Sequence, residues 1–138
     1  MIIKRTYFVI PYTEKEVEKY KNSGNLLKHA RTGKDVVGVM FISRDKRDLI
    51  GYCAWKGDYI VALEVLSEYR GKGFGEKLIR AAIKSGCKKL SVSRNNQAAI
   101  NLYTKVGFKA NNTNLGPKQI EMEYDNTKTK PLCHRRLL

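Results

Sequence analysis

Apolar positions in the first half of the chain recur with the period of β-strands. Branched, hydrophobic runs of strand length occupy residues 1–10, 36–42, 49–55 and 59–65. A charged turn at 44–47 joins the second run to the third, which predicts an antiparallel hairpin. The fourth run is expected to extend that hairpin, and Glu64 is its only charged residue.

Three longer stretches are predicted to be helical, at 14–20, 74–85 and 96–105. Thr13 and Glu16 have the spacing of a capping box at the start of the first helix. Gly86 and Gly107 are placed to end the other two helices. Residues 26–30 are expected to form one further short turn of helix.

Strand patterns return in the second half, at 88–93, after Phe108 and at 119–124. In the last of these, Ile120, Met122 and Tyr124 alternate with polar residues. The mixture of elements predicts an α/β fold. No break in composition divides the 138 residues, so we expect a single domain over 1–125 and a basic, polar tail over 126–138.

The fourth strand and the second helix are separated by a glycine-rich turn made of Arg70, Gly71, Lys72, Gly73, Phe74 and Gly75. A helix that begins in such a turn leaves backbone N–H groups without partners at the positive end of its dipole. The three glycines can take positive φ and let an oxyanion approach the main chain, while Arg70 and Lys72 add positive charge. The turn therefore predicts a phosphate site, with an ordinary entry into a helix as the alternative.

Two better-known phosphate loops do not fit this turn. A P-loop requires G-x-x-x-x-G-K-[ST], which the chain lacks. The dinucleotide fingerprint requires G-x-G-x-x-G and an acidic residue about 20 positions later. Here Gly75 follows Gly73 one position too early for that pattern, and residues 91–95 carry no acid.

The turn matches R/Q-x-x-G-x-G/A, and in this it resembles the acetyl-CoA pyrophosphate loop of the GCN5-related N-acetyltransferase (GNAT) superfamily. A second family motif, N-x-x-A-[IV]-x-L-Y followed by K-x-G-F, matches residues 96–103 and 105–108 in the right order. The resemblance implies a splayed, antiparallel-rich sheet with helices on both faces. It also implies acetyl-CoA as cosubstrate and a primary amine that attacks the thioester directly in a ternary complex.

In that mechanism the turn at 70–75 would hold the pyrophosphate. The main chain of Leu63 and Val65 would pair with the pantetheine arm like an added strand. A backbone N–H near Val65 or Leu66 would stabilise the oxyanion. The family asparagine falls on Asn96, which would contact the pantetheine or the active-site backbone and is also well suited to cap a helix.

The resemblance places two proton-transfer groups. The family tyrosine falls on Tyr103, which would protonate the departing thiolate; the alternative is a core-facing aromatic. Glu64, a carboxylate in an apolar strand, is the candidate base for the amine. Strict alternation would set Glu64 with Ile60 and Ala62, turned from the substrate unless a bulge intervenes. Glu121 or a chain of waters is the alternative base.

The charge balance adds a further class of partner. Lys and Arg number 27 against 13 Asp and Glu, which gives a net charge of +14 and an attraction to polyanions. CoA is itself a polyanion, but nucleic acid and the ribosome stay open as partners, as does a solvated basic surface. A GNAT-fold protein that acts on nucleic acid, tRNA or a ribosomal protein is thus the alternative to a small-amine acetyltransferase. A third alternative, a degenerate member that binds CoA or a partner without turnover, is disfavoured because the family's motif residues are intact.

Other features are less informative. Cys53, Cys87 and Cys133 are widely spaced, so neither a structural disulfide nor a zinc site is expected. The apolar runs are too short to span a membrane, and we expect a cytoplasmic monomer or homodimer without a membrane partner. His29, in the segment that walls the acceptor site of similar enzymes, is either a base or a solvated side chain.

Overall fold

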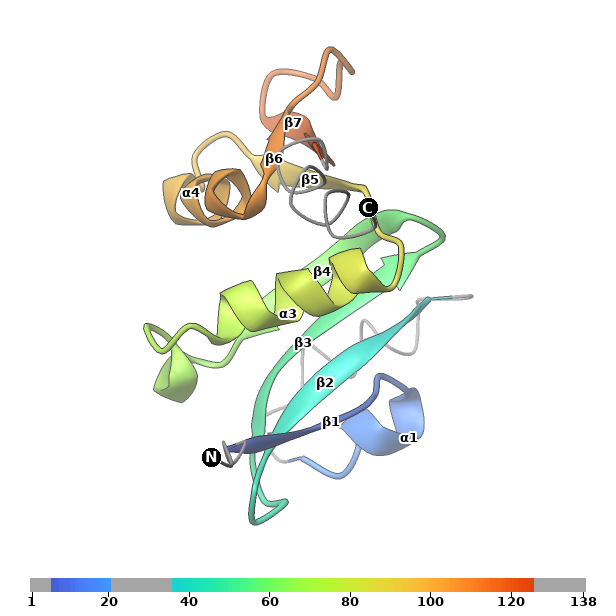
Figure 1. Ribbon diagram of the computed structural model, residues 1–138, viewed down its shortest axis with the longest axis vertical. Helices are drawn as coiled ribbons and strands as arrows, with labels where there is room; N and C mark the ends of the chain where they lie inside the picture. The colour runs from blue at the N-terminus through green and yellow to red at the C-terminus, as the bar shows by residue number, and fades with distance from the viewer. Residues whose placement is uncertain (1–5, 21–35, 126–138) are drawn as a thin grey trace, which may run out of the picture. The chain divides into compact units, whose positions relative to one another are not determined.

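A computed structural model of the chain describes residues 6–20 and 36–125, which fall into two compact units, Met1–Cys87 and Lys88–Leu138 (Figure 1). The first unit contains β1 (Tyr7–Pro11), α1 (Glu14–Val17), β2 (Val37–Ser43), β3 (Leu49–Lys56), β4 (Tyr59–Val65), the short 3₁₀ helix η1 (Ser67–Tyr69) and α3 (Phe74–Lys84). The second contains β5 (Lys89–Ser93), α4 (Gln97–Val106), β6 (Phe108–Ala110) and β7 (Gln119–Tyr124). The short helix predicted at 26–30, with His29, lies outside the described residues, and the single domain over 1–125 stays a prediction.

The first four strands form an antiparallel sheet in the order β1-β2-β3-β4, so the predicted hairpin and its extension are confirmed. Two irregularities interrupt the register. One lies between Phe41 and Ile42 where β2 pairs with β3, and the other lies between Ala54 and Trp55 where β3 pairs with β4. The second one sets the direction of the side chains near the end of β4.

The helix α3 packs on one face of this sheet, chiefly against β3 and β4. Gly51 permits the close approach: a Cβ there would lie 3.1 Å from Cδ1 of Leu78 and 2.6 Å from the carbonyl oxygen of Glu64. At the start of the helix, the ring of Phe74 makes an edge contact with Tyr7, which stacks on Phe41 with ring centroids 4.2 Å apart. Buried aromatic and aliphatic area thus fixes the beginning of α3 on the sheet.

The opposite face of the sheet carries a second core, here called the amino-terminal cluster. Its buried members are Tyr12, Val17, Tyr20, Met40, Ile42, Leu49, Tyr52 and Ala54. Because Tyr52 follows Gly51 in β3, the two residues point to opposite faces, and α1 therefore lies across the sheet from α3. The prediction of helices on both faces is confirmed for this unit.

Local capping decides where the helices begin and end. Oγ1 of Thr13 accepts from the N–H of Glu16 at 3.2 Å, as the capping pattern predicts. The helix α1 nevertheless ends at Val17, earlier than expected. After the C-cap Glu18, the N–H groups of Lys19 and Tyr20 bond three residues back, to the carbonyls of Glu16 and Val17.

The two longer helices end as predicted. Gly86 follows α3 with φ of 105°, and the N–H of Cys87 bonds the carbonyl of Ala82. Gly107 ends α4 with φ of 126°.

In the second unit, β7 lies between β5 and β6 and is antiparallel to both. Phe108 is at the centre of its core, with the rings of Tyr103 and Tyr124 at centroid distances of 6.0 and 5.5 Å. Glu121, a polar residue of β7, is buried. It is only 7% exposed and accepts a hydrogen bond from Nδ2 of Asn111 at 2.7 Å.

The buried thiols predict a loss of stability at high pH. Cys53 and Cys87 are free and buried, and burial, with a smaller effect of Asp58, raises the pKa of the Cys87 thiol from 9.0 to about 11. The folded chain therefore keeps this proton where the unfolded chain releases it, so folding stability falls as pH rises from 9.0 to about 11.

Between pH 9.0 and about 11, we expect the free energy of unfolding to fall less in Cys87→Ala than in the unchanged protein. The difference between the two falls is expected to reach about 2 kcal/mol. Urea denaturation at a series of pH values measures the difference between the two curves. Parallel curves would contradict the assignment.

Candidate active site

The turn between β4 and α3 has the geometry of an anion site. Gly71 and Gly73 have φ of 77° and 86°, and a Cβ on either would meet nothing within 4 Å. Gly73 is also the N-cap of α3 and provides no capping side chain, so the first N–H groups of the helix are left for a ligand. Gly75 does not use positive φ, contrary to the role it shared with the other two glycines, because it already lies in the first turn of α3.

Basic side chains surround this turn, and one of them shapes it. Nε of Arg70 donates to the carbonyl of Val65 at 2.8 Å, which ties the turn to the last residue of β4. Nζ of Lys72 lies 5.7 Å from the centre of the Tyr69 ring, and the Tyr69 hydroxyl donates to Asp48 at 3.0 Å. The turn therefore fits a phosphate, and Arg70 has a structural role that the sequence motif did not reveal.

At the end of β4, the backbone N–H and C=O groups alternate between the side that faces β3 and the opposite side. The N–H of Leu66 donates to the carbonyl of Ile50 at 2.8 Å and so faces β3. Since backbone groups alternate along an antiparallel strand, those of Leu63 and Val65 point away from β3. Of the two N–H groups considered for the oxyanion, the one of Val65 is directed away from the sheet partner, whereas the one of Leu66 is already used.

Glu64 is turned by the irregularity in β4. Trp55 pairs with Ile60, but Ala54 pairs with Ala62, so β4 has one extra residue between the two pairs. Directly paired residues point to the same face of the sheet. Since the neighbours Ala54 and Trp55 point to opposite faces, their partners Ala62 and Ile60 do so too. Strict alternation therefore does not hold, and the bulge named as its exception is present. Glu64 lies with Ala62 and across the sheet from Ile60.

On that face Glu64 meets a tyrosine that sequence reasoning missed. Tyr52 is directly opposite Glu64 in the register, and its hydroxyl donates to Oε1 of Glu64 at 3.3 Å. Tyr52 is itself stacked on Tyr12. No local sequence pattern identifies this pair, because finding it requires the register of β3 and β4, including the extra residue in β4.

The candidates in the second unit occupy well-defined structural positions. Tyr103 lies on α4, is 8% exposed and packs against Phe108. Oδ1 of Asn96 accepts from the N–H of Ala99 at 3.1 Å and so caps α4. Both structural roles offered for these residues are thus present, and their roles in catalysis and cofactor binding stay predictions.

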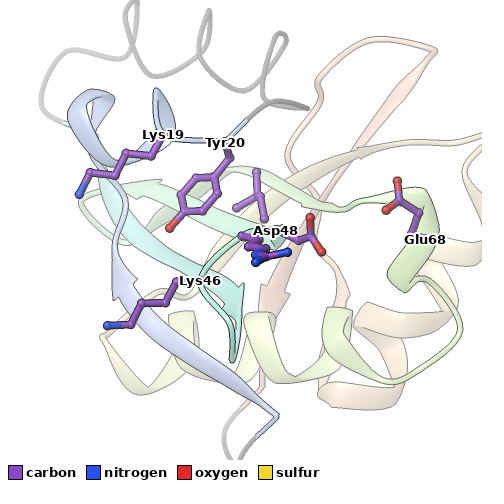
Figure 2. Close-up of a pocket in the computed structure, with 7 residues that line it drawn as sticks. Lys19, Tyr20, Lys46, Asp48 and Glu68 are labelled. Atoms are coloured by element: carbon purple, nitrogen blue, oxygen red, sulfur yellow. The ribbon is translucent and has the colours of Figure 1, made fainter.

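A pocket of about 430 Å³ opens in the first unit beside α1 (Figure 2). It is lined by Lys19, Tyr20, Lys46, Arg47, Asp48, Leu49 and Glu68. In Figure 2, Lys19 and Lys46 lie on one side of Tyr20, and Asp48 and Glu68 lie on the other. No motif marked these residues, because they come together from α1, the β2–β3 turn and η1.

No group of three or more His, Cys, Asp or Glu residues within 6–20 and 36–125 is placed to hold a metal ion. In the same ranges, no helix is long and apolar enough to cross a membrane.

The family model for the acetyltransferase (GNAT) family matches residues 3–108. The chain belongs to this family. The match spans the glycine turn at 70–75, Asn96, Tyr103 and the K-x-G-F motif, so the resemblance drawn from those residues is confirmed, together with the fold class.

Solved structures share the fold at low identity. The chain is similar to NAA60 of Arabidopsis thaliana in complex with acetyl-CoA, with 17% identity, a TM-score of 0.63 and coverage of 86% of this chain and 98% of that one. It is also similar to the PaiA N-acetyltransferase of Thermoplasma acidophilum in complex with coenzyme A, with 18% identity, a TM-score of 0.62 and coverage of 88% of this chain and 99% of that one. A third similar structure is the spermidine/spermine N-acetyltransferase SpeG of Vibrio cholerae, with 16% identity, a TM-score of 0.62 and coverage of 91% of this chain and 96% of that one.

The glycine turn generates a test of the anion site. Gly73→Ala would put a methyl group on a residue with φ of 86° at the start of α3, and we expect CoA to bind about tenfold more weakly. Gly57→Ala is the matched control, since Gly57 has φ of 62° with nothing within 4 Å of its Cβ position and lies in the turn between β3 and β4. Calorimetry at fixed salt measures both, and equal losses of affinity would mean that backbone strain alone is responsible.

Proposed function

We propose that this protein is an acetyl-CoA-dependent N-acetyltransferase that transfers the acetyl group to a primary amine by direct attack in a ternary complex. The observation that carries the proposal is the turn at 70–75. It combines positive-φ glycines, an uncapped helix start and adjacent basic side chains in a chain of the acetyltransferase (GNAT) family. We further propose a cytoplasmic monomer or homodimer.

The cosubstrate would be held by main chain as much as by side chains. The N–H groups at the start of α3, with Lys72 and the guanidinium of Arg70, would bind its pyrophosphate. The outward backbone groups of Leu63 would pair with the pantetheine arm, together with the Val65 carbonyl, which also accepts from Arg70. Asn96 would contact the arm from the start of α4. When bound, acetyl-CoA supplies an acetyl group activated as a thioester.

Three groups would carry the chemistry. The N–H of Val65 would stabilise the oxyanion of acyl transfer. Glu64 would take a proton from the amine, and Tyr103 would give one to the thiolate. Glu121 remains the competing base, because it is a buried carboxylate fixed by Asn111.

The net charge of +14 supports a second candidate function, in which the amine belongs to a nucleic acid, a tRNA or a ribosomal protein. Such a substrate would dock through many weak charge contacts. Its binding would fall steeply with salt, whereas binding of a small amine would not.

The proposed function is tested by titrating acetyl-CoA into the protein at high salt, with ADP as the control ligand. We expect one-to-one binding that needs the acyl-pantetheine arm, followed by thiol release when primary amines are added. Absence of acetyl-CoA binding would overturn the proposal, since the turn would then be only an entry into α3.

The two candidate bases make different predictions. Glu64→Gln removes the proton acceptor at almost constant shape, so we expect kcat/KM to fall about 100-fold or more and the acidic limb of the pH–rate profile to disappear. Glu121→Gln, the matched change in the other unit, is expected to keep that limb. An unchanged pH–rate profile in Glu64→Gln, with a loss of the limb in Glu121→Gln, would transfer the base to Glu121.

A further inference from the structure

The carboxylate of Glu64 is held from the neighbouring strand. Tyr52 on β3 is directly opposite it, and the Tyr52 hydroxyl donates to Oε1 at 3.3 Å. This hydrogen bond engages one of the two oxygens of the Glu64 carboxylate. The other oxygen, Oε2, is left to accept a proton.

The ring of Tyr52 has little freedom to move. It is 6% exposed and stacks on Tyr12, with centroids 5.5 Å apart and ring planes inclined by 10°. Tyr12 is 4% exposed, and its N–H bonds the carbonyl of Gly38 at 3.0 Å, which anchors it to β2. Two packed rings therefore fix the position of the hydroxyl that meets Glu64.

The Tyr52 hydroxyl is a lasting donor. Burial raises the pKa of Tyr52, and the Glu64 charge and Tyr12 raise it further. Burial also raises the pKa of Tyr12 to about 12. The Tyr52 hydroxyl is therefore protonated at neutral pH and is available as a donor to Glu64.

Other titratable groups face the same side of the sheet from the elements packed there. They are Tyr20 in the amino-terminal cluster and Lys19, Lys46, Arg47, Asp48 and Glu68 around the adjoining pocket. Tyr52 is distinguished from these groups by its direct hydrogen bond to Glu64.

We propose that Tyr52 is a positioning residue for catalysis, which holds one oxygen of Glu64 by its hydrogen bond and directs the second oxygen toward the amine. The inference rests on the proposed function, with Glu64 as base. In the step, the proton leaves the ammonium nitrogen for Oε2 of Glu64, the nitrogen keeps the electron pair that attacks the thioester, and Tyr52 retains its own proton.

The test is Tyr52→Phe, which removes the hydroxyl and keeps the ring that stacks on Tyr12. We expect kcat to fall about tenfold and the KM for acetyl-CoA to stay the same. Tyr69→Phe is the matched control, because it removes a hydroxyl that donates to a different carboxylate, Asp48. It is expected to change none of these quantities.

A double-mutant cycle separates positioning from packing. In the Glu64→Gln background, Tyr52→Phe is expected to change kcat less than twofold, because there is no longer a base to position. An equal loss in both backgrounds would overturn the inference and leave Tyr52 as a structural residue.

Carbon-13 spectroscopy of the Glu64 carboxyl tests the same inference without turnover. Because Tyr52→Phe removes the hydrogen bond to this carboxyl, we expect its resonance to shift in Tyr52→Phe and to stay in place in Tyr69→Phe. An unmoved resonance in Tyr52→Phe would overturn the inference even if acetyl transfer is observed. A moved resonance in a protein that releases no thiol would instead show that the proposed function, and not the contact, is wrong.

Discussion

One extra residue in β4 determines which way the functional end of that strand faces. Side chains alternate along a strand, so a single unpaired residue exchanges the two faces for everything that follows. Before it, Ile60 points to the side covered by α3. After it, Glu64 points to the amino-terminal cluster and meets Tyr52. The contact between Glu64 and Tyr52, and the roles that follow from it, depend on this one change of register.

The described acids use two kinds of donor. On the surface, Glu16 pairs with Lys19 and Glu76 with Arg80, while Asp48 accepts from the hydroxyl of Tyr69. Glu64 accepts from the neutral hydroxyl of Tyr52, and Glu121 accepts from the neutral amide of Asn111. A neutral donor satisfies a carboxylate oxygen without cancelling its charge, and it avoids the desolvation cost of a buried cation.

Local signals made most of the elements predictable. Hydrophobic periodicity identified the strands, and the Thr13, Gly86 and Gly107 signals identified helix ends, because each depends on neighbours within a few residues. The glycine turn was predictable for the same reason, since its backbone angles and the helix dipole are properties of a short segment.

Features that depend on pairing between distant segments were not predictable in this way. The hydrogen bond from Tyr52 to Glu64, the burial of Glu121 and the pocket beside α1 all require the three-dimensional register. The capping pattern predicted the start of α1 better than its end. After Val17, the N–H groups of Lys19 and Tyr20 bond to carbonyls three residues back, and the α-helical pattern does not continue. Tyr103 and Asn96 are intermediate cases, in which the sequence identified residues with clear packing and capping positions.

The hydrogen bond from Arg70 to the carbonyl of Val65 has a thermodynamic consequence. The turn receives its shape from the chain itself, through this bond. The conformational entropy of forming the loop is therefore lost during folding, before any ligand arrives. Less of the interaction energy with an anion is then consumed in ordering the protein, and more of it is expressed as affinity.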